Sequence, residues 1–109
     1  MSSDELTDQE LDEQFRKMTD HFIDQANQLV SAQHNPENVS LALLHAASRF
    51  NAFVVSAHAP TLSDYEGELD KAKVFFQSTY EQMLSDNLQD YKSVYQDDFK
   101  YQHLMAAQN

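Results

Sequence analysis

The segment from Val39 to Ala59 constrains the fold more than any other part of the chain, because fourteen of its twenty-one residues are apolar or alanine. On a helix, nine of these residues fill one unbroken arc about 140° wide, whereas a surface helix needs an apolar stripe of only about 100°. The arc consists of Ala42, Phe53, Ala46, Val39, Ala57, Phe50, Leu43, Val54 and Ala47. We therefore expect the central helix of a bundle, with Phe50 and Phe53 in the core.

Helix-breaking residues are scarce, since the 109 residues include one Gly and two Pro. This composition and length predict a single all-α domain over residues 1–109. The chain has no Cys, which excludes disulfides and thiolate chemistry. Its first residues are acidic and no apolar run exceeds four residues, so we expect neither a secretory signal nor a membrane span. A cytoplasmic protein is the expectation.

The formal net charge of −11 arises from 18 acidic and 7 basic residues. Such a surface repels nucleic acids and anionic membranes, so we expect neither as a partner. The acidity could serve a basic partner or mimic a nucleic acid toward a DNA-binding protein. Solubility alone is the simplest explanation of the charge.

Capping signals and apolar spacing divide the chain into three helices. Thr7 and Glu10 form a capping box before a helix that runs to about Gln33. Asn35 is the expected N-cap of a second helix, which ends near His58. A further capping box at Ser63 starts a third helix through Met83. Short connections predict an antiparallel up-down-up three-helix bundle, with a frayed terminus at 1–6 and a C-terminal extension at 89–109.

The extension carries a second apolar stripe at helical spacing, rotated by roughly 100° from the stripe of the third helix. Either the helix breaks near residues 85–87, or this second stripe contacts something else. The second helix has a surplus strip of Leu41, Leu44, Ala52 and Val55, which we expect the tail or a second protomer to cover. The candidate interface residues are Leu41, Leu44, Val55, Tyr91, Tyr95 and Phe99.

Catalytic and metal-binding motifs are absent from the sequence, so no enzyme activity, catalytic residue, metal or cofactor is expected. Arg49, His45 and Ser56 lie on one side of the second helix. Together they are a candidate contact for an anion or a carboxylate, which a guanidinium binds bidentately. The alternative is that Arg49 pairs with an acidic residue of another helix and covers apolar surface with its stem.

The pattern Ser40-x-x-Leu43-x-x-Ala46-Ala47-x-Arg49-Phe50-Asn51-Ala52-Phe53 resembles a family of short, uncharacterised proteobacterial proteins with a domain of unknown function. The likeness covers roughly Phe15 to Leu88. It implies a bacterial, cytoplasmic, helical protein, and it carries no activity, cofactor or catalytic residue.

These features lead to one main hypothesis and two alternatives. The main hypothesis is a small acidic helical protein that acts through protein–protein contact, as an adaptor, a regulator or a homodimer. The first alternative is a small-ligand or anion-binding protein that uses Arg49, His45 and Ser56. The second is a nucleic-acid mimic that uses the acidic face of the first helix.

Overall fold

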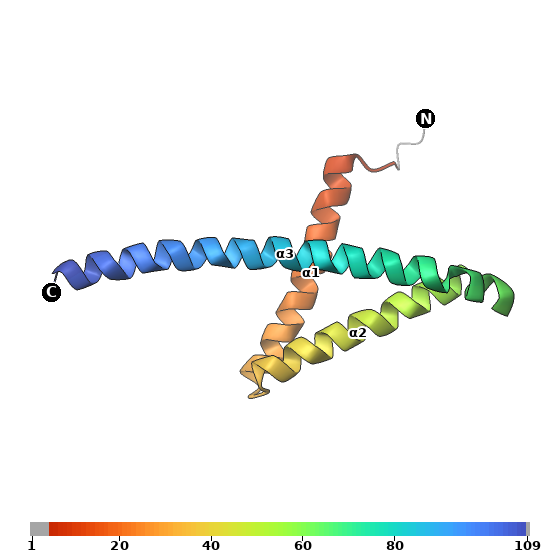
Figure 1. The fold of residues 1–109 in the computed structure, drawn as a ribbon, viewed down its shortest axis with the longest axis horizontal. Coiled ribbons are helices and arrows are strands. Elements are labelled where there is room, and N and C mark those ends of the chain that lie inside the picture. Colours follow the sequence, from red (N-terminus) through yellow and green to blue (C-terminus); the bar gives the residue numbers. More distant parts are fainter. Residues whose placement is uncertain (1–4, 109) are drawn as a thin grey trace. The chain divides into compact units, whose positions relative to one another are not determined.

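The computed structural model describes the backbone of residues 5–108 and the side chains of residues 5–97. Three helices follow one another: α1 (Asp8–Ser31), α2 (Pro36–Ala57) and α3 (Leu62–Gln108) (Figure 1). Residues 5–108 contain no strand, so the prediction of an all-α fold with three helices is confirmed. The chain divides into two compact units, Met1–Val54 and Val55–Asn109. Of the predicted frayed terminus, residues 1–4 lie outside the described residues.

The first unit is a helical hairpin made of α1 and most of α2. Thr7 caps α1 as predicted, since its side chain accepts a hydrogen bond of 3.1 Å from the backbone N–H of Glu10. The Asn35 Oδ1 atom caps α2 by accepting from the N–H groups of Glu37 and Asn38, at 2.8 and 3.3 Å. Pro36 at the first helical position sacrifices no hydrogen bond, because that N–H has no partner within a helix.

The turn between these helices has the hydrogen bonds of a Schellman motif. His34 N–H donates to the carbonyl of Leu29, and Gln33 N–H donates to that of Val30. This motif places one residue in the left-handed region, where glycine is usual. Here that residue is Gln33, with φ of 72°. The turn therefore holds Gln33 in a backbone conformation that is unfavourable for residues with a Cβ atom.

Few side chains of the first unit are protected from solvent, and Asn51 and Val54 are half-buried far from the turn. Val39, which is 8% exposed, is the one buried residue among the described side chains, and Ala26 is half-buried. The prediction that Phe50 and Phe53 lie in the core is wrong, since these side chains are 65% and 61% exposed. The physical reason is that α1 and α2 diverge as they leave the turn (Figure 1). The rings pack on each other instead, with centroids 5.9 Å apart.

The second unit consists of the end of α2, a reversing connection and α3. Thr61 caps α3: its Oγ1 atom accepts from the Asp64 N–H at 3.1 Å and donates to the Asp64 carboxylate at 2.9 Å. The predicted capping box at Ser63 is therefore wrong by two residues. Asp64 is the cause, because it occupies the third helical position counted from Thr61 and can close the reciprocal bond there.

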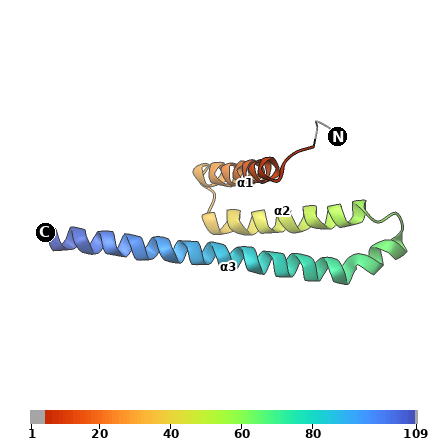
Figure 2. The ribbon, with the colours of Figure 1, turned by 90° about the horizontal axis from the view of Figure 1, so that it is seen from above.

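α3 continues without a break to Gln108, a span of 47 residues (Figure 2). The predicted C-terminal extension is thus helical, and the third helix is about twice as long as expected. No break occurs near residues 85–87. Asp86 supports the helix there, since its carboxylate accepts a hydrogen bond of 3.0 Å from the Gln82 amide one turn earlier.

Replacing Gln33 with glycine should stabilise the hairpin. Gly occupies the left-handed region without steric cost, so we expect Gln33→Gly to raise the free energy of unfolding by about 0.5–1 kcal/mol. Urea unfolding followed by circular dichroism measures this change. As a control, Gln25→Gly in the interior of α1 should lower stability by about 1 kcal/mol. A loss of stability in Gln33→Gly would contradict the expectation.

Alanine substitutions discriminate between the two capping positions of α3. Thr61→Ala removes the acceptor for the Asp64 N–H, and we expect a loss of about 1 kcal/mol in the free energy of unfolding. Ser63→Ala should have almost no effect, because Ser63 already lies inside the helix. The same urea titration compares the two variants. A larger loss in Ser63→Ala would place the cap where the sequence pattern predicted it.

Candidate functional site

The apolar residues of α3 form two stripes with different surroundings. The first stripe was predicted to consist of Tyr65, Leu69, Ala72, Phe76, Tyr80 and Met83. Its first four members are half-buried, whereas Tyr80 and Met83 are 45% and 47% exposed. We define the tail stripe as the second set, at a 4-3-4 spacing: Leu84, Leu88, Tyr91 and Tyr95. All of its members are exposed, with exposed fractions of 62% for Leu88, 66% for Tyr91 and 75% for Tyr95. Within these two stripes, half-burial is therefore confined to Tyr65, Leu69, Ala72 and Phe76, and the last members of the first stripe are as exposed as Leu84.

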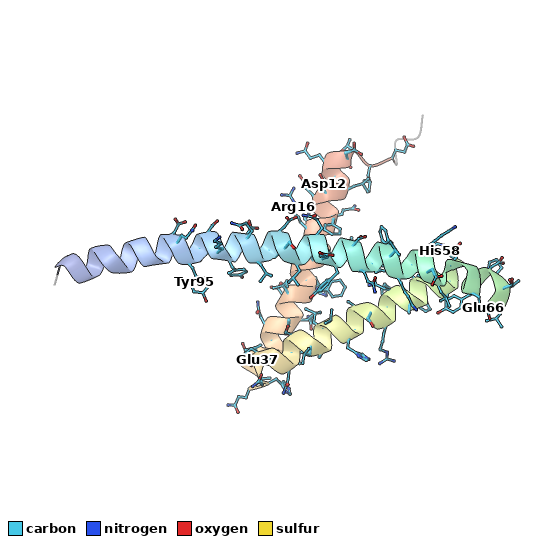
Figure 3. The ribbon with its side chains drawn as sticks, viewed as in Figure 1. Asp12, Arg16, Glu37, His58, Glu66 and Tyr95 are labelled. Atoms are coloured by element: carbon cyan, nitrogen blue, oxygen red, sulfur yellow. The ribbon has the colours of Figure 1, made fainter. Side chains whose placement is uncertain are left out.

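The predicted interface residues lie on this stripe and on α2. Tyr95 projects from the C-terminal half of α3 (Figure 3). On α2, Leu41 and Leu44 are exposed, whereas Val55 is half-buried. The side chain of Phe99 lies outside the described residues. Five of the six positions can thus be placed, and four of these are exposed large apolar or aromatic side chains.

The three polar candidates lie on one face of α2, as the helical repeat requires. Arg49, His45 and Ser56 are all exposed. An anion held by an exposed guanidinium stays largely hydrated, so the attraction is weak. The geometry of these residues alone provides no enclosed binding site.

Two groups of exposed apolar side chains were not identified as contact surfaces from the sequence. One is the apolar face of α1, which includes Leu11, Phe15, Met18 and Phe22. The other is the Phe50–Phe53 pair on α2. Both follow the helical repeat that the sequence shows, but the pattern was assigned to a core. Periodicity identifies an apolar face and does not say which element covers it.

Three acidic residues of the C-terminal half of α3 lie opposite the tail stripe, whereas Asp98 falls at its border by helical spacing. At 100° per residue, Asp86, Asp90 and Asp97 fall on the opposite side of the helix. Glu81 and Lys92, which have opposite charges, lie along one edge of the stripe, and the neutral Asn87 lies along the other. The stripe is therefore apolar with an electrostatically mixed border.

The described residues differ in what they offer for metal binding and for membrane insertion. No group of three or more His, Cys, Asp or Glu side chains is placed to hold a metal ion there. α2 is long and apolar enough to cross a membrane by length and composition. This is weak evidence, because core helices of water-soluble proteins have the same properties.

Comparison with known proteins identifies the class to which this fold belongs. Residues 15–92 match the family described as "Protein of unknown function (DUF3144)". Because the match covers more than half of the chain, the protein belongs to this family. No match was found among curated proteins or among solved structures.

The substitution Arg49→Ala tests whether the three polar residues of α2 bind an anion. Because the side chain is exposed, we expect Arg49→Ala to change the free energy of unfolding by less than about 0.5 kcal/mol. We expect phosphate or acetate to change the thermal unfolding midpoint of the native chain and of the variant by the same amount. Differential scanning fluorimetry at constant ionic strength measures both effects. A phosphate-induced rise that disappears in the variant would instead support an anion site at Arg49.

Proposed function

We propose that this protein acts through protein–protein contact, using apolar side chains that its own helices leave exposed. The observation that carries the proposal is the exposure of the tail stripe, whose two tyrosines are 66% and 75% exposed. Contiguous apolar surface of this kind is rare on proteins that function alone and is typical of interaction sites. Tyrosine is also enriched among the residues that dominate binding energy at interfaces.

The strip on α2 supports the same proposal. Leu41 and Leu44 are exposed one turn apart, and removing either side chain from water would lower the free energy of the complex. Burial of apolar surface contributes about 25 cal/mol per Å², so a few leucine and tyrosine side chains can stabilise a complex by several kcal/mol before ordering costs. An amphipathic helix of this kind binds into a groove or against another helix.

The charge distribution narrows the class of partner. With a net charge of −11, nucleic acids and anionic membrane surfaces are repelled rather than attracted. Insertion of α2 into a bilayer is disfavoured by Arg49, which costs about 2.5–3.5 kcal/mol near the centre of a membrane-spanning helix. A protein surface is therefore the partner that the proposal favours, and no catalytic role is included in it.

Quantitative co-purification from the native host tests the proposal. A tagged chain expressed beside the untagged chain should recover a near-stoichiometric protein, either another protein or the untagged copy. Paired substitutions Leu41→Gln with Leu44→Gln, or Tyr91→Gln with Tyr95→Gln, should reduce this recovery several-fold, because they make an apolar surface polar. Ser93→Gln, on the side of α3 opposite the tail stripe, is the matched control. Recovery of the tagged chain alone, as a monomer, would contradict the proposal.

A further inference from the structure

The α1–α2 hairpin, which belongs to one unit of the chain, has an apolar surface that is protected near its turn and exposed at its open end. Near the turn, Val39 is buried and Ala26 is half-buried. By helical spacing, large exposed side chains lie on the same sides of the two helices as these residues. They are Leu11, Phe15, Met18 and Phe22 on α1, and Phe50 and Phe53 on α2.

The exposed parts of the two apolar faces lie at similar distances from the turn. At 1.5 Å per residue, Phe15 lies about 24 Å along α1 from Ser31, and Phe50 lies about 21 Å along α2 from Pro36. The apolar arc of α2 is also wider than the stripe of about 100° that a surface helix needs. Because α1 and α2 diverge (Figure 1), a third helix can contact both faces at the open end.

The first turns of α1, at the open end of the hairpin, are strongly acidic. The chain has no Lys or Arg before Arg16, and its exposed carboxylates in this stretch are Glu5, Asp8, Glu10, Asp12 and Glu13. Charges interact over a Debye length of about 10 Å at 0.1 M salt, so these groups act together on an approaching molecule. This end of α1 therefore attracts positive charge.

The charges nearest to the exposed apolar surface have both signs. By helical spacing, Asp8 and Asp12 border the apolar face of α1, and Arg16 follows beyond them (Figure 3). Arg49 borders the arc of α2, whereas Lys17 lies on the opposite side of α1 from the apolar face. Over residues 5–54 these three basic side chains face eight acidic ones. The hairpin as a whole is therefore negative, although its two arginines lie close to the apolar surface.

We propose that the open end of the α1–α2 hairpin binds a basic amphipathic helix of another protein. This inference rests on the proposed function and adds the class of partner and a second surface. The apolar stripe of the partner helix contacts Phe15, Phe50 and Phe53. Its Lys or Arg side chains lie near Asp8 and Asp12. Amphipathic helices are commonly recognised through such apolar anchors, and opposite charges accelerate and select the encounter.

Charge favours this partner over helices of the same protein. α3 contains nine acidic and four basic residues, so an α3 helix brings a negative charge to an already negative hairpin. A complete second copy brings a net charge of −11. A basic helix from another protein instead gains attraction at long range and apolar contact at short range.

The exposed apolar area is sufficient for a reversible complex. The six large side chains offer roughly 600 Å², or about 1,200 Å² when an equal area of the partner is included. This value lies at the lower limit for specific interfaces, so we expect dissociation constants in the micromolar range. Added salt should weaken binding, because it screens the attraction between opposite charges.

Isothermal titration calorimetry of the full chain with synthetic peptides tests the proposal. The probe is a peptide of about 18 residues in which Leu follows the helical repeat and Lys fills the other positions. We expect micromolar binding that weakens several-fold when NaCl is raised from about 0.05 to 0.3 M. A peptide of the same composition in scrambled order, and a peptide with Glu in place of every Lys, should each bind about tenfold more weakly or worse.

Matched variants locate the binding surface. Phe15→Gln and Phe50→Gln should each raise the dissociation constant roughly fivefold or more, because each removes an apolar anchor. Phe75→Gln is the control, since Phe75 of α3 is 60% exposed, much like Phe15 at 63%. Asp12→Asn should weaken binding more than Asp24→Asn, which removes the same charge on the opposite side of α1. Circular dichroism of each variant shows whether its helices persist, and these side chains are all exposed.

The outcomes separate this inference from the proposed function. A native chain that does not bind the Leu/Lys peptide at about 200 μM overturns the inference, as does equal binding of the scrambled or the Glu peptide. Equal effects of Phe15→Gln and Phe75→Gln also overturn it. Self-association that Phe15→Gln abolishes, without peptide binding, assigns the surface to a second copy instead.

The proposed function has its own test in co-purification, which depends on Tyr91 and Tyr95 of the tail stripe. If the peptide does not bind but the chain recovers a protein through those tyrosines, the proposed function stands without the basic helix. A chain that binds the peptide yet recovers no protein from its host overturns the proposed function alone.

Discussion

The unbroken backbone hydrogen bonding of α3 is the constraint on which the rest of the structure depends. A helix of 47 residues is about twice as long as α1 or α2, and neither connection is long enough to compensate for the difference. The chain contains no proline after Pro60, and its single glycine, Gly67, lies near the beginning of α3. No proline or glycine therefore interrupts the second half of the helix, and the exposed tail stripe lies on its continuous surface.

Asp86, Asp90 and Asp97 lie on the side of α3 opposite the tail stripe. This arrangement makes the strong acidity of the chain compatible with the contact role that we propose. A net charge of −11 keeps copies apart at long range, whereas apolar contact acts only at short range.

Membership of the DUF3144 family groups this chain with others of its kind without assigning an activity. The matched residues 15–92 include most of α1, all of α2 and the first part of the tail stripe. The features that remain for a functional argument are surfaces: the tail stripe, the exposed leucines of α2 and the apolar face of α1. The contact role that we propose uses these surfaces, whereas the polar residues Arg49, His45 and Ser56 stand exposed on one helix.

By itself, the sequence determined the helical class, two of the three capping residues and the 100° rotation between the stripes of α3. These features depend on groups within about four residues of one another, so local spacing specifies them. Only the tertiary structure decided which apolar faces are covered, because exposure depends on where other helices go. Phe50 and Phe53 are exposed since α1 and α2 diverge, and the spacing of apolar residues along one helix does not specify the path of the other.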